Sequence, residues 1–187
     1  MIIRFATPLD ASEILEIYSP FVKNSPATFE TTVPSISEMQ DRMKNGATTH
    51  PWIVAQNDLD KKILGYAYAS PHRSRAAYQW CVESSVYLCE SARGQGTGTA
   101  LYDVLFEILR RQQFVNVYAG ITSPYPPSEK FHQKYGFQKI GIYPRIGFKI
   151  DRWHDVGWWE YRLREVSDRE LPLPPTLLAQ TRWPSNL

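Results

Sequence analysis

The chain has 187 residues, of which 43% are hydrophobic and 21% charged, and its formal net charge is +2. A chain of this length supports one domain with a buried core, and its composition is that of a folded globular protein rather than a disordered one. Basic and acidic residues are interspersed, and no apolar run approaches the roughly 20 residues of a membrane-spanning helix. We therefore expect a cytoplasmic protein with neither nucleic-acid nor membrane partners.

The N-terminal part of the chain predicts a strand followed by two helices. Residues 1–5 are a short apolar run and predict the strand. The first helix is expected to begin after Thr7, where a proline takes the first helical position, and to end at Pro20. The second is expected to begin at Ser35 or Ser37 and to end at the Asn45-Gly46 pair.

The middle of the chain predicts three strands and one amphipathic helix. Residues 52–55, 63–69 and 78–88 are β-rich, and the polar or proline-containing breaks between them predict hairpins. Residues 96–112 have the apolar spacing of a helix that packs on a sheet. The residues with that spacing are Leu101, Val104, Leu105, Ile108 and Leu109.

Two cysteines lie eight positions apart in what looks like one strand, Cys81 within the run 78–88 and Cys89 directly after it. An extended strand holds them much farther apart than the roughly 7 Å between Cα atoms that a disulfide tolerates. We therefore expect two buried thiols and no bridge between them.

The last part of the chain predicts a strand at 116–121, a helix at 126–135 and two strands, one through residue 149 and one over 153–163. The element order indicates an α/β (α+β) protein with a mixed sheet whose first half is antiparallel. We expect residues 1–167 to form the domain. Residues 168–187 contain four prolines, so we expect a tail that is extended and either wraps a surface or stays loose.

A glycine-rich turn, Arg93-Gly-Gln-Gly-Thr-Gly98, connects a β-rich run to the amphipathic helix. Backbone N–H groups in such a turn can converge on an anion, assisted by the positive end of the helix dipole. A P-loop would need a lysine after the glycines, and a Rossmann fingerprint would need a third glycine where Thr99 or Leu101 stands. Taken alone, the turn could also be a strand-to-helix connection without a ligand.

The pattern Val86-Tyr-Leu88 followed by Arg93-x-x-Gly96-x-Gly98 resembles the acetyl-CoA pyrophosphate motif of the GNAT N-acetyltransferases. Residues 130–137, KFHQKYGF, resemble the helix-to-strand signature that follows in that superfamily. Stretches at 66–71, 75–78, 80–87, 152–158 and 170–175 narrow the resemblance to the phosphinothricin acetyltransferase branch. The resemblance implies a mixed, mostly antiparallel twisted sheet flanked by helices.

The resemblance also implies acetyl-CoA as cosubstrate and no metal. It assigns the pantetheine arm and the pyrophosphate to Val86, Tyr87, Leu88, Arg93, Gly94, Gln95, Gly96, Thr97, Gly98 and Thr99. One position departs from the branch, which usually has an asparagine that contacts the cofactor where this chain has Tyr125. A tyrosine can stack or donate a hydroxyl but cannot copy an amide, so cofactor affinity or orientation is expected to differ.

Acetyl transfer to an amine needs a base, because an ammonium group cannot attack a thioester. Period-two alternation places Glu83 opposite the apolar face of its strand, and the branch has a catalytic glutamate at this position of its Trp-x-x-Glu-Ser pattern. His132 stands where the branch has a histidine and many GNAT enzymes have a tyrosine that protonates the thiolate. The alternatives are a solvent-facing strand glutamate and a histidine that packs or caps. His154, with its aromatic neighbours, is expected to be a structural core residue.

The substrate is expected to be a small amino acid or an analogue such as phosphinothricin or methionine sulfoximine. The branch lines its amino-acid site with basic residues at the positions of Arg73 and Arg75 and with aromatics at Phe29 and Tyr78. Guanidinium groups match a carboxylate or phosphinate in bidentate geometry. Two alternatives are a peptide or protein N-terminal acetyltransferase and a non-catalytic acyl-CoA-binding sensor. The resemblance further implies a homodimer, for which residues 153–161 and the tail offer surface.

Overall fold

The computed structural model describes residues 1–46, 48–167 and 173–180. Seven strands form one sheet in the order β1-β2-β3-β4-β5-β7-β6. The strands are β1 (Ile2–Phe5), β2 (Trp52–Gln56), β3 (Ile63–Pro71), β4 (Cys81–Leu88), β5 (Asn116–Ser123), β6 (Gln138–Lys149) and β7 (Arg152–Arg162). The helices are α1 (Ala11–Asn24), α2 (Ile36–Gly46), α3 (Thr97–Arg111) and α4 (Pro126–Tyr135).

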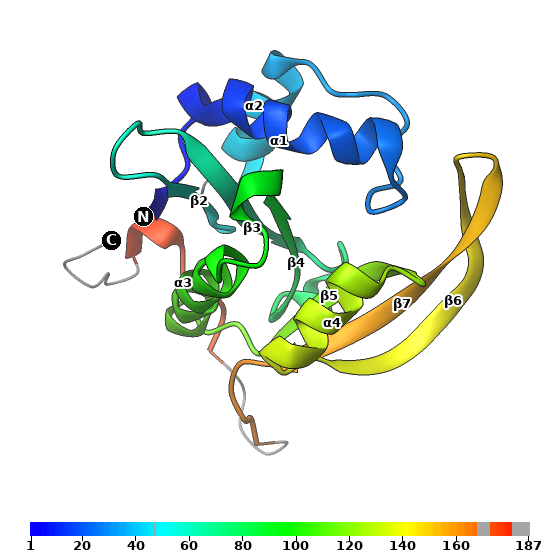
Figure 1. Cartoon of the computed structure of the whole chain (residues 1–187). Helices are drawn as coiled ribbons and strands as arrows, with labels where there is room; N and C mark the ends of the chain where they lie inside the picture. The colour runs from blue at the N-terminus through cyan, green and yellow to red at the C-terminus, as the bar shows by residue number, and fades with distance from the viewer. Residues whose placement is uncertain (47, 168–172, 181–187) are drawn as a thin grey trace.

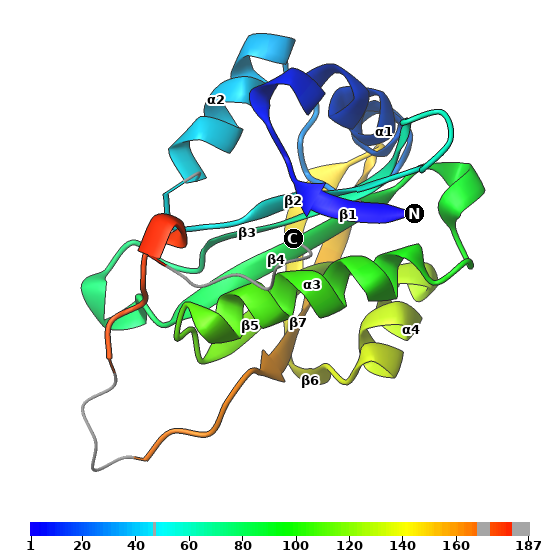
Figure 2. The ribbon, with the colours of Figure 1, turned by 90° about the vertical axis from the view of Figure 1, so that its left-hand side faces the viewer.

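Helices cover both faces of the sheet (Figure 1), with α1 and α2 on one face and α3 and α4 on the other (Figure 2). The core on the α3 side contains the fully buried helix residues Leu101, Leu105, Ile108 and Leu109. The core on the α1–α2 side contains Ile14, Val22, Met39, Met43 and Tyr66. The predicted fold class, a mixed and mostly antiparallel sheet flanked by helices, is confirmed.

The sheet parts between its fourth and fifth strands. β4 and β5 are parallel and pair over three residues only: Cys81–Glu83 of β4 lie opposite Asn116–Tyr118 of β5. Beyond Glu83, β4 continues to Leu88 on its antiparallel pairing with β3, while β5 continues to Ser123 on its pairing with β7. The two strands therefore leave a gap that opens toward the N-terminus of α3.

The predicted end of the first helix at Pro20 is wrong, since α1 continues to Asn24. Pro20 lacks an N–H group, which leaves the carbonyl of Glu16 without its helical partner. Both residues are exposed, so water can satisfy that carbonyl. Val22, beyond the proline, is almost fully buried against the sheet, and this packing favours continuation of the helix.

Two further expectations are corrected. The strand predicted from residue 78 begins at Cys81, because Ala76–Tyr78 forms a 3-10 turn instead. Cys81 and Cys89 are free thiols, as expected, but each is half-buried rather than buried. The two thiols lie at the two ends of β4, because Cys81 is its first residue and Cys89 follows its last residue, Leu88.

The described part of the C-terminal tail, residues 173–180, contacts the domain. Trp80 Nε1 donates to the Leu173 carbonyl over 2.7 Å, and the Leu178 N–H donates to the Thr48 carbonyl over 2.9 Å. The rest of the predicted tail lies outside the described residues, and the domain boundary at residue 167 stays a prediction. None of the helices in the described ranges is long and apolar enough to cross a membrane.

Candidate active site

The glycine-rich turn between β4 and α3, residues 94–99, is called the cradle below. Gly94 and Gly96 have φ values of +73° and +83°, the left-handed region that glycine adopts without strain. None of the backbone N–H groups of residues 94–99 donates to another group within the described part of the chain. The first N–H groups of α3 belong to this set, as expected for a helix start. A Cβ at Gly94 or Gly96 would meet no atom within 4 Å, so the space above the cradle is open.

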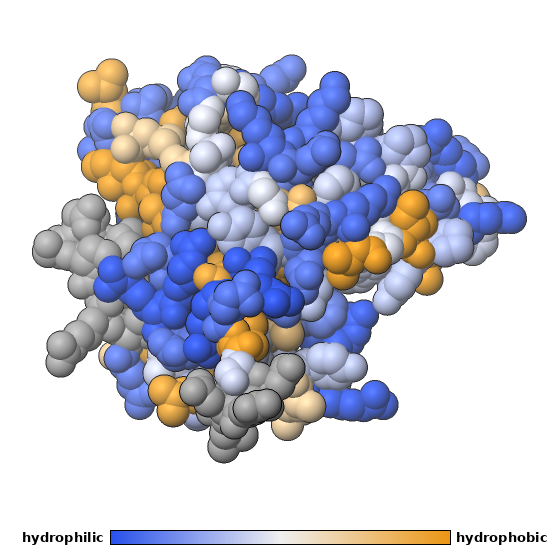
Figure 3. Space-filling model, turned by 90° about the horizontal axis from the view of Figure 1, so that it is seen from below, coloured by the Kyte–Doolittle hydropathy of each residue, from blue (hydrophilic) through white to orange (hydrophobic). Residues whose placement is uncertain are grey.

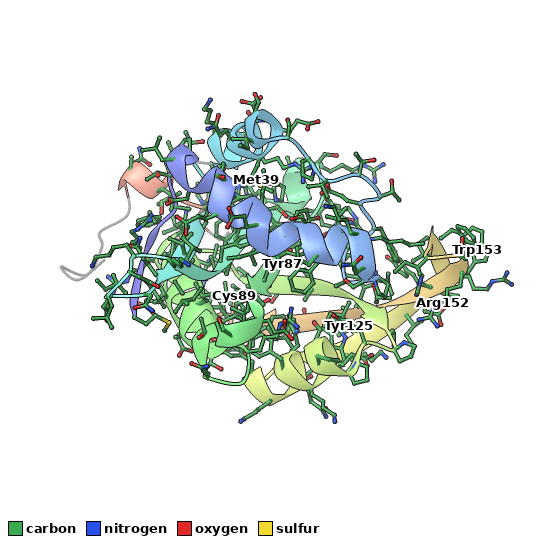
Figure 4. The ribbon with its side chains drawn as sticks, turned by 45° about the horizontal axis from the view of Figure 1, so that its top comes forward. Met39, Tyr87, Cys89, Tyr125, Arg152 and Trp153 are labelled. Carbon is green, nitrogen blue, oxygen red and sulfur yellow. The ribbon has the colours of Figure 1, made fainter. Side chains whose placement is uncertain are left out.

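A cavity of about 340 Å³ occupies the gap between β4 and β5 next to this cradle. The predicted cofactor residues that line it are Val86, Tyr87, Leu88, Arg93, Gly94, Gly98 and Tyr125. The others, Gln95, Gly96, Thr97 and Thr99, lie in the cradle outside this lining. Figure 4 shows Tyr87 beside α1 and Tyr125 at the start of α4. Because β5 has left β4 here, the backbone edge of β4 borders the cavity.

His132 belongs to a buried chain of hydrogen bonds on the α3 side of this cavity. Ser84 Oγ donates to the Tyr102 hydroxyl over 3.2 Å, and that hydroxyl donates to His132 Nε2 over 3.0 Å. His132 Nδ1 lies 2.8 Å from the carbonyl oxygen of Ser128. A carbonyl only accepts, so Nδ1 carries the proton and Nε2 accepts. This arrangement fixes the neutral tautomer of His132.

Burial reinforces that neutral form. It lowers the pKa of His132 to about 4, although the Ser128 carbonyl favours the charged form and opposes this shift. Burial also raises the pKa of Tyr102 well above its usual value. Both side chains are therefore uncharged near neutral pH, and the chain of hydrogen bonds from Ser84 to Ser128 holds no net charge.

Glu83 lies outside the lining of this cavity, on the face of β4 opposite to that of Ser84, with its side chain 31% exposed. His72 Nδ1 lies 3.0 Å from Glu83 Oε1, and a guanidinium nitrogen of Arg73 lies 3.6 Å from the same oxygen. The pairing of β3 with β4 runs without a bulge from Gly65 to Pro71, so the predicted alternation holds. Glu83 is thus a half-exposed carboxylate held between two basic side chains.

The remaining predicted substrate residues are spread around Glu83. Arg73 stacks over the Trp158 ring at 5.7 Å, and Tyr78 lies edge-on to His72 at 6.2 Å between ring centroids. Arg75 is exposed, and within the described part of the chain its side chain makes no hydrogen bond or ion pair. The structure therefore brings Arg73 and Tyr78 to the Glu83 region.

Phe29 lies in the loop between α1 and α2 and packs against the β6–β7 hairpin. A Cβ on Gly147 would lie 2.3 Å from the Phe29 ring, so only glycine permits this approach. Lys149 Nζ donates to the carbonyls of Phe21 and Thr28, over 3.4 and 2.7 Å. His154 is buried, as expected for a core histidine, and its Nε2 donates to the Lys149 carbonyl. The hairpin thus holds the loop that carries Phe29.

Sequence reasoning missed several residues of this region. Tyr102 and Ser84 join His132 through contacts between α3, β4 and α4, and His72 contacts Glu83 across the β3–β4 pair. A signal existed for Tyr102, which is a hydroxyl-bearing side chain within the apolar face of α3. No local pattern indicates that His72 reaches Glu83. Within the described residues, no cluster of three metal-ligating side chains occurs.

Comparisons with known proteins give the family. Residues 3–158 match the model of the acetyltransferase (GNAT) domain. The chain is 34% identical to phosphinothricin N-acetyltransferase of Streptomyces viridochromogenes, covering 92% of this chain and 90% of that one. It is 31% identical to the L-methionine sulfoximine/L-methionine sulfone acetyltransferase of Pseudomonas aeruginosa, covering 86% and 94%.

A solved structure with the same fold is a GNAT superfamily phosphinothricin acetyltransferase from Sinorhizobium meliloti in complex with AcCoA. It superposes with a TM-score of 0.82 and 34% identity, covering 94% of this chain and 97% of that one. The family match spans the strands, the cradle and the helix that carries His132. The chain therefore belongs to the GNAT N-acetyltransferase family, whose members use acetyl-CoA.

Proposed function

We propose that this protein transfers the acetyl group of acetyl-CoA to the amino group of a small amino acid or an analogue of the phosphinothricin or methionine sulfoximine type. The observation that carries the proposal is the position of Glu83, which lies 3.6 Å from Arg73 on the strand that leads to the cradle. A carboxylate that could accept a proton and a guanidinium that could bind an anionic group would then serve the strand that leads to the proposed phosphate site. The names of the relatives support the same substrate class.

The cradle and the cavity fit acetyl-CoA. The unpartnered N–H groups of residues 94–99 suit a pyrophosphate, and the open edge of β4 at Val86, Tyr87 and Leu88 suits the amide-bearing pantetheine arm. When bound, acetyl-CoA supplies an activated acetyl group. The residues of this chain bind it, orient it and move the protons of the reaction.

Gly96→Val tests the cradle. The variant places a branched side chain in the open space above the N–H groups and strains a left-handed backbone position. We expect the Kd for acetyl-CoA, measured by isothermal titration calorimetry, to rise at least tenfold, or about 1.4 kcal/mol. Gly141→Val, on the β6–β7 hairpin where a Cβ also meets open space, is the matched control. Unchanged affinity in a folded Gly96→Val protein rules out this cradle as the phosphate site.

Glu83 is the proposed general base. Both basic neighbours contact Oε1, so Oε2 is the oxygen that would take the proton from the substrate ammonium group. The electron pair of that N–H bond stays on the nitrogen and becomes the nucleophile.

Glu83→Gln keeps the shape of the side chain and removes its basicity. We expect kcat/KM near neutral pH to fall by about 10²-fold or more, and the loss to shrink at high pH, where free amine is abundant. The measurement is the pH dependence of kcat/KM for the amino acid, followed as thiol release at saturating acetyl-CoA. A variant whose pH profile matches that of the wild type would remove Glu83 from the mechanism.

His132 is proposed to supply the proton that the departing thiolate needs. Because resting His132 is neutral and its Nε2 accepts from Tyr102, this nitrogen has no proton to give, and the proton between the two residues lies on the Tyr102 hydroxyl, which also lines the cavity. We therefore propose that His132 acts together with Tyr102 rather than as a free imidazolium. Tyr125, where the branch has asparagine, lines the same cavity and is proposed to contact the cofactor.

The anionic group of the substrate is proposed to bind at Arg73 and Arg75. Arg73 also contacts Glu83, so a change there affects the base as well, whereas Arg75 shows no such contact in the described residues. Phe29 and Tyr78 are proposed to line the rest of the amino-acid site. Both rings are more than a third exposed, which leaves them accessible to a ligand.

Replacing the substrate carboxylate by an amide should lower kcat/KM by roughly 10- to 150-fold, the loss of one charge-assisted hydrogen bond. Arg75→Ala should give a similar loss with the carboxylate and little further loss with the amide, because both changes delete the same interaction. Arg152→Ala, at the tip of the hairpin in Figure 4, is the matched control. If the losses in kcat/KM from Arg75→Ala and from amidation add, Arg75 does not bind the carboxylate. If the wild type acetylates amides as fast as carboxylates, a peptide substrate is favoured.

We also propose a homodimer with twofold symmetry. The β6–β7 hairpin projects from the body of the protein (Figure 1) and exposes about half of each of Ile140, Ile142, Ile146, Phe148 and Trp153. Figure 3 shows hydrophobic patches on the side toward which this hairpin projects. Burying such residues against a second copy would stabilise a dimer through removal of apolar surface from water.

Sedimentation at micromolar concentration should show a species of twice the 21.6 kDa chain mass. Trp153→Glu, which puts a charge into the proposed contact, should shift the population toward monomer without unfolding the domain. Leu59→Glu, at an exposed turn between β2 and β3, is the control and should remain dimeric. A wild-type protein that sediments only as monomer would overturn the proposed dimer.

A further inference from the structure

His72 is held rigidly against the proposed base. It follows the last residue of β3, and its Nδ1 lies 3.0 Å from Glu83 Oε1 across the β3–β4 pair. Its ring stacks on Tyr118 with centroids 4.5 Å apart and meets Trp158 edge-on at 5.7 Å. Only 15% of its side chain is exposed. These contacts hold the imidazole ring in an orientation in which Nδ1 faces the carboxylate of Glu83.

The hydrogen bond fixes which nitrogen carries the proton. A carboxylate accepts only, so Nδ1 must donate, whether the imidazole is neutral or charged. The neutral form makes a hydrogen bond to the carboxylate, and the charged form makes an ion pair with it. An ion pair stabilises the carboxylate more strongly and so makes it a weaker base.

The other ionisable groups around His72 are few. Arg73 and Tyr78 come from the loop after β3, Cys81 and Glu83 from β4, Tyr118 from β5 and, behind Tyr118, Glu160 from β7. Burial and the neighbouring Glu160 raise the pKa of Tyr118 to about 12, and burial raises the pKa of the Cys81 thiol. Tyr118 therefore stays neutral through the range in which imidazole titrates. Arg73 stays charged.

We propose that His72 is a positioning residue for Glu83: its Nδ1–H holds Oε1 so that Oε2 faces the substrate amine, and protonation of its ring weakens the base. This inference rests on the proposed role of Glu83 and adds a second titrating group to it. No bond to His72 forms or breaks during the acetyl transfer itself. The proton moves from the ammonium nitrogen to Glu83 Oε2 and then to solvent.

Two variants separate the functions of the ring. His72→Phe keeps an aromatic ring against Tyr118 and removes the donor, whereas His72→Asn keeps an N–H donor near the position of Nδ1 and cannot titrate. His50→Asn is the control, because His50 packs on Phe114 and bonds Thr49 instead. Each is assayed for kcat/KM and for KM of acetyl-CoA between about pH 5.5 and 9, the range in which histidine changes charge.

For His72→Phe we expect kcat/KM at neutral pH to fall about tenfold or more, with KM for acetyl-CoA unchanged. His72→Asn should retain most activity at high pH and lose less activity than the wild type on acidification. His50→Asn should match the wild type. In a Glu83→Gln background, His72→Phe should add less than about a twofold loss, because it acts through Glu83.

The outcomes distinguish the two levels of the proposal. A fully active Glu83→Gln protein overturns the base itself. An impaired Glu83→Gln protein combined with wild-type rates and pH profiles in both His72 variants overturns only the role of His72. Equal losses in His72→Phe and His72→Asn, with an unchanged pH profile, also overturn that role and leave His72 a structural residue.

A spectroscopic measurement does not depend on turnover or on stable His72 variants. The ¹⁵N shifts of the imidazole nitrogens report which nitrogen carries the proton in the neutral ring. We expect the Nδ1–H form for His72 in the wild type, and a shift toward the Nε2–H form in Glu83→Ala, which has no acceptor. The same tautomer in both proteins would show that Glu83 does not hold His72.

Discussion

The point at which β4 and β5 part is the constraint on which the rest of the site depends. Three residues of β4, Cys81–Glu83, pair with three residues of β5, Asn116–Tyr118. Beyond them, each strand pairs only with its other neighbour in the sheet. β4 stays extended because β3 pairs with it as far as Leu88. The parting creates the cavity, exposes a backbone edge of β4 to it and directs the end of β4 toward the cradle at the start of α3.

Alternation along β4 then separates two environments. Glu83 points to the α1–α2 face, where it is half-exposed and contacts His72 and Arg73. Ser84, the next residue, points to the α3 face and donates to Tyr102 in a buried, uncharged chain of hydrogen bonds. Burial favours the neutral forms of the His132 imidazole and the Tyr102 phenol, whereas Glu83 lies among basic side chains at the edge of solvent. One strand thus presents a charged group and a neutral group on opposite faces, an arrangement suited to taking up one proton and delivering another.

The hairpin of β6 and β7 contributes by holding a loop distant in sequence. Lys149 is almost fully buried, and burial lowers its pKa, yet its ammonium group donates to two carbonyls at the end of α1 and in the loop after it. An ammonium group is buried at little cost only when such partners are present. The loop is therefore fixed where Phe29 lies against Gly147, and the hairpin determines one wall of the proposed amino-acid site.

Features that depend on neighbouring residues could be predicted from the sequence. The apolar spacing of residues 96–112 predicted α3, the helix predicted at 126–135 is α4, and the glycine-rich turn connects a strand to a helix as expected. Contacts between distant segments could not be predicted this way. His72 reaches Glu83 across 11 residues, Tyr102 reaches His132 across 30, and Lys149 reaches Thr28 across 121. Even the continuation of α1 through Pro20 depended on the packing of Val22. Local periodicity encodes which face of an element is buried, but strand order and the parting of β4 from β5 decide which polar groups meet, and only the tertiary structure contains that information.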